Sequence, residues 1–220
     1  GSGPVTAVIT ISGSNEIALV IDGSAIETDP RLAPLTEALR VTATLRLEAG
    51  GWRVPTLSVR SSQLALEAQA QGSSGTDWQA SGDLAFSGTL EGVALSFAGG
   101  LATGFELNST AGLITARTVT ATEAIVIGNT RFNVPRLALN AEYGDGNLSA
   151  DWTLAGRYDT RELLLAGAAQ QDGADWTLAV QDGQFGPSVI EADASLDQGR
   201  LQLSLLAGTQ ARWSLSVEYS

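Results

Sequence analysis

Residues 40–71 read RVTATLRLEAGGWRVPTLSVRSSQLALEAQAQ, and this stretch sets the pattern of the whole chain. Apolar side chains occupy every second position from Val41 to Leu47, and polar ones occupy the positions between them. The alternation resumes after a Gly50-Gly51 break and again from Leu64 to Ala70. A period of two indicates β-strands with one polar and one apolar face. We therefore predict a series of antiparallel strands joined by short turns.

The same unit repeats through most of the 220 residues. We count about 14 to 16 predicted strands of roughly 6–10 residues each. Glycine-rich turns are predicted at Gly13-Ser14-Asn15, Gly99-Gly100, Gly144–Asn147 and Asp182-Gly183. The last predicted strand is 212–219. Because no linker interrupts the series, residues 5–220 are interpreted as a single domain and residues 1–4 as a cloning remnant.

One segment, Gly23 to Leu39, departs from the alternation. Asp29 followed by Pro30 is typical of a helix start. Leu32, Leu35 and Leu39 then follow at helical spacing. The segment predicts one short helix, whose simplest role is to cover an open sheet edge.

Two prolines mark a weak internal repeat. The segments Trp52–Val59 (WRVPTLSV) and Phe132–Leu139 (FNVPRLAL) share the order aromatic, polar, Val, Pro, polar, apolar, small, apolar. Proline inside a strand indicates an edge or a bulge. We therefore predict a change of apolar phase at Pro55 and at Pro135.

The composition excludes several chemistries. The chain contains no Cys, His or Met, and each of its 12 basic residues is Arg. Thiol nucleophiles, imidazole bases and Cys/His zinc sites are therefore ruled out. The net charge of −12 argues against nucleic acid as a partner, because that partner requires a basic surface. No apolar run is long enough to cross a membrane as a helix.

The acidic side chains and the tryptophans are the two groups of residues that could form a binding site. The acids lie at alternate strand positions or in turns, which favours solvation over a calcium site; they are Asp145, Asp172, Asp175, Asp182, Glu191, Asp193 and Asp197. The five tryptophans are spread singly along the chain, which favours packing near the ends of the apolar strip over a stacking platform; they are Trp52, Trp78, Trp152, Trp176 and Trp213.

Three closed or curled architectures could bury so many one-sided strands. A sandwich would have longer crossovers and a bulkier core. A membrane barrel would have aromatic girdles. An elongated sheet that curls into a trough suits short turns and a Leu, Val, Ile and Ala face. Fifteen strands would extend this trough to roughly 70 Å, with a width of roughly 30 Å. The predicted fold class is therefore all-β, an elongated and curled antiparallel sheet with an apolar interior.

The residues predicted to line this groove share the apolar phase of their strands. They are Val41, Ala43, Leu45, Leu47, Leu57, Val59, Leu64, Leu66, Leu84, Phe86, Val93, Leu95, Phe97, Ile125, Ile127, Leu137, Leu139, Trp152, Leu154, Leu201, Leu203, Leu215 and Val217.

The phrases WRVPTLSVRSSQLALEAQAQGSS, SGDLAFSGTLEGVALSF and WTLAVQDGQFGP resemble the TamB family of the Gram-negative envelope. This family belongs with the AsmA-like proteins that share a repeating β-groove, or β-taco. The resemblance implies a fragment of a longer periplasmic protein anchored in the inner membrane. It also implies phospholipid movement to the outer membrane and a TamA-like barrel of the Omp85 type as partner of the full-length protein.

Two functions follow as expectations. The first is a non-enzymatic groove that binds acyl chains and conducts phospholipid between the inner and outer membranes. The second is a scaffold for outer-membrane protein assembly, which adds client strands to an open sheet edge. Neither requires a cofactor or a metal.

Overall fold

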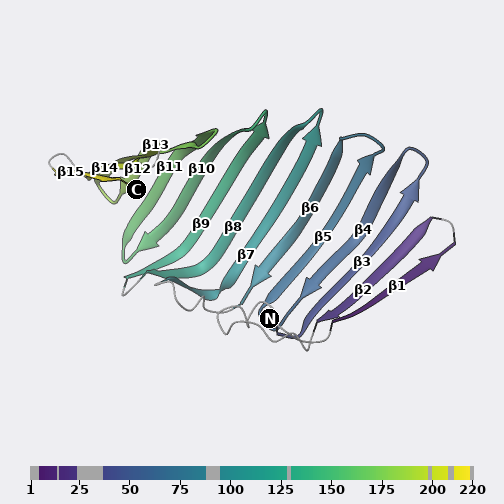
Figure 1. Cartoon of the computed structure of the whole chain (residues 1–220). Coiled ribbons are helices and arrows are strands. Elements are labelled where there is room, and N and C mark those ends of the chain that lie inside the picture. The colour runs from purple at the N-terminus through teal and green to yellow at the C-terminus, as the bar shows by residue number, and fades with distance from the viewer. Residues whose placement is uncertain are drawn as a thin grey trace.

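The strands of the chain form one antiparallel sheet, seen in a computed structural model (Figure 1). The structure describes residues 5–13, 15–23, 37–87, 95–127, 130–197, 200–207 and 211–218. The sheet has 15 strands, and their order in space is their order in sequence. Each inner strand is thus hydrogen-bonded to the strands before and after it, and β1 and β15 are the two edge strands. The prediction of an all-β antiparallel fold with about 15 strands is confirmed.

The strands vary in length along the chain. The first six are β1 (Thr6–Ser12), β2 (Glu16–Gly23), β3 (Leu39–Glu48), β4 (Gly51–Arg60), β5 (Leu64–Ser73) and β6 (Trp78–Phe86). Three long ones follow, β7 (Leu95–Thr110), β8 (Leu113–Ile127) and β9 (Thr130–Gly144). The last six are β10 (Asn147–Tyr158), β11 (Arg161–Asp172), β12 (Asp175–Phe185), β13 (Ser188–Asp197), β14 (Arg200–Ala207) and β15 (Ala211–Glu218).

The tight turns explain why neighbouring strands are antiparallel. Between β9 and β10 the chain turns at Asp145 and Gly146, whose φ angles are 53° and 81°. Two successive positive φ angles match the twist of the flanking strands, and Asp-Gly is a preferred pair for such a turn. The turn predicted here from sequence is therefore confirmed.

Two predicted turns are wrong. Gly99 and Gly100 lie inside β7, and Asp182 and Gly183 lie inside β12. At both places the strand continues through a register irregularity, between Ala98 and Leu101 and between Val180 and Gln184. Glycine tolerates a bulge as readily as a turn, so the local signal was ambiguous. For this reason β7, at 16 residues, exceeds the predicted length.

The predicted phase changes at the two prolines coincide with bulges. The pairing of β4 with β5 shifts between Val54 and Leu57, around Pro55. The pairing of β9 with β10 shifts between Ala155 and Arg157, opposite Pro135. Proline lacks a backbone N–H, so the ladder is interrupted where it stands. The predicted helix falls largely on residues 24–36, outside the described residues, while Gly23 and Leu39 end and begin strands.

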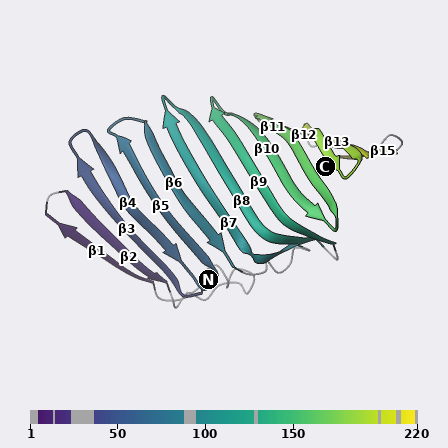
Figure 2. The ribbon, with the colours of Figure 1, turned by 180° about the vertical axis from the view of Figure 1, so that it is seen from behind.

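The described strands form a single layer (Figure 2). The surface area of the chain is 14092 Å². A compact protein of 22.7 kDa would expose about 9,500 Å². The surface of this chain is roughly half as large again, because no second layer of described strands packs on the sheet.

Candidate functional site: the apolar face of the sheet

An uncharged row of residues crosses the whole sheet. Residues paired directly across antiparallel strands point to the same face, so the pairing can be followed from edge to edge. The central row consists of Ile9, Leu19, Ala43, Leu57, Ala68, Gly82, Phe105, Thr118, Leu139, Trp152, Gly167, Val180, Ala192, Leu205 and Trp213. We call the side of the sheet that carries this row the apolar face.

The backbone register brings together most of the residues predicted from sequence. Val41 pairs with Val59, Leu66 with Leu84, and Leu137 with Leu154. Near the last edge of the sheet, Leu201 pairs with Val217 and Leu203 with Leu215. Only Val93 lies outside the described residues.

The bulges of β7, β8 and β9 preserve the apolar face instead of breaking it. Ile125 pairs with Phe97 on one side and with Phe132 on the other, and Ile127 pairs with Leu95. The Phe132 ring lies 5.7 Å from the Tyr158 ring, and Tyr158 lies 6.2 Å from Phe185. Tyr158 is in phase with Leu154 of the apolar face. The irregularities therefore return Ile125 and Phe132 to this face beyond the bulge.

No core seals the apolar side chains among the described residues. Phe86, Ala124 and Ala150 are the buried hydrophobic residues, and no large side chain is fully buried. Leu47 and Leu137 are 45% and 40% exposed. In a sandwich, facing side chains would interdigitate and bury such residues. Among the described residues, no second layer of side chains seals the apolar face.

A second row, of aromatic residues, lies at one end of the strands. The pairing runs from Trp52 through Gly72 to Trp78, and onward to Tyr143 and Trp176. A Cβ atom on Gly72 would come within 2.7 Å of the Trp52 ring. Trp52, Trp78 and Trp176 therefore lie near the ends of the apolar strip, as predicted, although Trp176 is 41% exposed, whereas Trp152 lies in the central row. The sequence analysis did not predict this row, although each of these aromatic residues lies close to a turn at the same end of the strands.

One charge stands out on the apolar face. Among the described strands, the regular pairing places one charged residue on this face, Arg161. The irregular pairs around the bulges of β7 to β9 are not counted here. Arg161 is paired with Tyr158 at the end of β10 and β11. Its guanidinium carbon lies 5.7 Å from the centre of the Phe185 ring, a cation–π contact.

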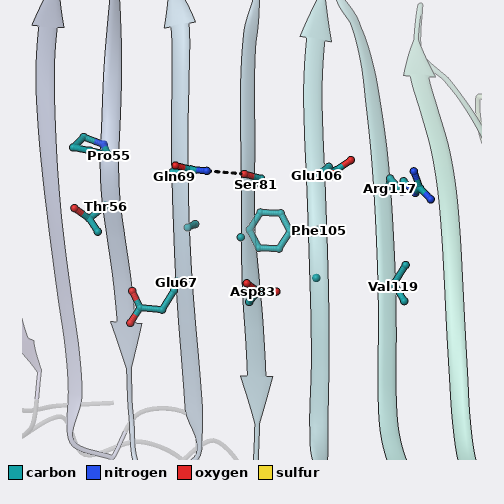
Figure 3. A pocket seen from close by; sticks show the side chains of 13 residues that line it. Pro55, Thr56, Glu67, Gln69, Ser81, Asp83, Phe105, Glu106, Arg117 and Val119 are labelled. Carbon is teal, nitrogen blue, oxygen red and sulfur yellow. Dashed lines mark hydrogen bonds between the residues drawn. The ribbon is translucent and has the colours of Figure 1, made fainter.

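The opposite, polar face carries most of the charged side chains and a shallow hollow. The hollow, of about 650 Å³, lies across β4 to β8 and is lined by Glu67, Asp83, Glu106 and Arg117 among others (Figure 3). Gln69 donates a hydrogen bond to Ser81 across it, at 3.3 Å. Ala68, Gly82 and Phe105 of the central row also contribute to its lining, but its charged residues belong to the polar face, so we do not assign the predicted apolar groove to this hollow.

One carboxylate on the polar face is well supported. Arg60 Nη2 donates to Glu67 Oε1 at 2.7 Å, and Ser58 Oγ donates to the same oxygen at 2.8 Å. The hydrogen bond from Arg60, followed by that from Ser58, lowers the pKa of Glu67. Both contacts are exposed or half-buried, which is typical of a structural ion pair and gives no sign of an acid–base catalyst.

The described residues contain no group of three or more acids that could hold a metal ion. No helix within them has the length and hydropathy needed to cross a membrane.

These features define the class of the protein as a single-layer antiparallel β-sheet with one apolar and one polar face. No family model, curated protein or solved structure matches the chain.

Proposed function

We propose that this chain is a segment of an apolar β-groove that binds acyl chains and conducts phospholipid across the periplasm. The observation that carries the proposal is the uncharged row of paired positions from Ile9 to Trp213, on a face whose described side chains no second layer seals. Exposed apolar patches on monomeric proteins usually mark a binding surface. A row without a charged residue suits a guest that slides, because no strand places a charge in the path of its apolar chain.

Acyl chains fit this surface better than a folded protein does. The central row mixes large residues with Ala and Gly, for example Leu57 beside Ala68 and Trp152 beside Gly167. Such a surface has many shallow contacts and few polar anchors, whereas specific protein interfaces use about one hydrogen bond per 100–200 Å². In the proposal, the sheet curls so that its apolar face becomes the interior of the groove, in a periplasmic protein anchored in the inner membrane.

A charge substitution on the apolar face tests this function. We expect Leu139→Glu to reduce co-purified lipid severalfold in native mass spectrometry, because an acyl chain that lies across β9 would then meet a carboxylate. Asn140→Glu is the matched control, since Asn140 lies one position further along β9, is exposed and faces the polar side. Absence of lipid from the unmodified chain, with no binding of a fluorescent fatty acid, would count decisively against the proposal.

The edge strand β1 supports a second candidate, a scaffold that adds client strands for assembly with an Omp85-type barrel. Every residue of β1 is exposed, and Ile9 and Ile11 are 65% and 70% exposed. The strand has no charge, no proline and no bulge, which are the usual means of blocking edge pairing. Site-specific crosslinking from Val8 and Ile11 would test it. Capture of barrel strands at these positions, with no lipid on the apolar face, would favour the scaffold.

A further inference from the structure

The structure assigns to Arg161 and Tyr158 the contact with the anionic head of a bound acyl amphiphile, whose tail lies on the apolar face beside β10 to β12. This inference rests on the proposed function and adds to it the chemical class of the ligand and the place where its head binds.

The position of Arg161 is the first argument. Among the regularly paired residues of the described strands, Arg161 is the single charged residue on the apolar face, and it stands at the end of the aliphatic strip. Leu163 and Leu165 follow on the same strand and pair with Gly156 and Leu154. An amphiphile has the same arrangement, with a charged end attached to an apolar tail, so charge complementarity specifies an anionic head.

The surroundings of Arg161 are the second argument. The chain's two described ion pairs are Arg46 with Glu16 and Arg60 with Glu67, and neither involves Arg161. The side chain instead lies over Phe185, which directs its donors without occupying their hydrogen bonds. A guanidinium offers five donors in a planar fork that suits a phosphate or a carboxylate.

The aromatic cluster supplies the boundary between head and tail. Phe132, Tyr158 and Phe185 form a chain of ring contacts at 5.7 and 6.2 Å. Tyr158 is 41% exposed and has a hydroxyl that can donate to an ester or phosphate oxygen. Aromatic side chains with a polar group favour the region between hydrocarbon and water.

The test compares three lipids with identical acyl chains: phosphatidic acid, phosphatidylglycerol and uncharged diacylglycerol. We expect the two anionic lipids to bind the unmodified chain about fivefold more tightly than diacylglycerol, the size of one exposed charge contact. Arg161→Gln should abolish this preference, and Arg161→Lys should retain part of it. Sodium chloride at 1 M should reduce the preference, because it screens exposed charges.

Arg157→Gln is the matched control. Arg157 lies four residues earlier and is also exposed. By alternation it faces the polar side, where Glu162 is the residue opposite it in the strand register. It should leave the preference for anionic lipid unchanged, and circular dichroism should show the same β-sheet signal for all variants.

The outcomes separate this inference from the function on which it rests. Equal binding of diacylglycerol and the anionic lipids would overturn the role of Arg161 and leave the acyl groove standing. An equal loss of preference in Arg157→Gln would also overturn it. If inorganic phosphate alone displaced the lipid at the concentration at which phosphatidic acid binds, Arg161 would be assigned to a free-anion site and not to a lipid head. Failure of all three lipids to bind would remove the proposed function itself.

Discussion

Gly167 is a position where the absence of a side chain decides how two strands approach each other. A Cβ atom there would collide with the carbonyl oxygen of Ala179 and come within 2.7 Å of the Trp152 ring. The pairing of β11 with β12 shifts between Ala166 and Gly167, so the backbone of β12 lies unusually close. In the central row, Gly167 therefore provides the space that the Trp152 ring occupies.

Gly167→Ala is expected to lower the free energy of unfolding by about 2–3 kcal/mol, because the added methyl must displace backbone as well as an indole ring. Gly104→Ala is the control, since its Cβ would meet only the Asp83 carboxylate at 3.4 Å. That change should stay within about 1 kcal/mol of the unmodified chain. Urea unfolding followed by tryptophan fluorescence measures both, and equal effects would show that the close approach at Gly167 is unimportant.

Glu67 gives a residue-level prediction about pH. Its pKa is lowered from the model-peptide value of 4.5 by hydrogen bonds from Arg60 and Ser58. A carboxyl group with a lower pKa in the folded state stabilises the fold above its unfolded pKa, and this contribution is lost as pH falls through the folded pKa. Stability should thus decline below about pH 4.5. Glu67→Gln should weaken that decline, and thermal unfolding from pH 7 to 3 measures it. A variant with the same acid dependence would contradict the assigned role.

At the scale of elements, the bulges of β7, β8 and β9 are the feature on which the continuity of the apolar face depends. Gly100 has a φ of 83°, and a Cβ there would meet the carbonyl oxygen of Phe86 at 2.7 Å. Gly112, in the turn between β7 and β8, has a similar φ of 86° with no atom nearby. Comparing alanine substitutions at Gly100 and Gly112 therefore separates the destabilisation caused by the positive φ angle from that caused by the close contact.

We expect Gly112→Ala to destabilise the sheet by about 1 kcal/mol through backbone strain alone. Gly100→Ala should cost at least twice as much, because the same strain is joined by a clash with the neighbouring strand. It should also increase amide hydrogen exchange in β7 to β9 more than in β3 to β5. Uniform exchange in the two regions would argue that the bulge is not a local structural requirement.

Much of the sheet could be predicted from alternation, because a period of two fixes both the strand and its apolar phase. The phase changes at Pro55 and Pro135 could also be predicted, since proline interrupts a ladder wherever it falls. The interpretation of Gly99-Gly100 and Asp182-Gly183 was wrong, because a bulge and a turn use the same residues and only pairing with a neighbour distinguishes them. The aromatic row and the lone Arg161 required register across many strands, which no single segment encodes.

At the scale of the whole molecule, a single layer has a different size from a packed domain. Fifteen strands about 4.8 Å apart, with lengths of roughly 35 Å, give a radius of gyration of roughly 22 Å. A compact 220-residue domain would have about 17 Å. Small-angle X-ray scattering of the monomeric chain is therefore expected to give the larger value.

The same sheet curled along its length into a trough would keep its long dimension and shorten only its width. The radius of gyration would then fall slightly while remaining well above 17 Å. Scattering with and without bound fatty acid would reveal such curling as a narrower cross-section in the loaded protein. A value near 17 Å would mean that the apolar face folds onto itself into a sealed core, which would remove the surface from which both the acyl groove and the role of Arg161 are argued.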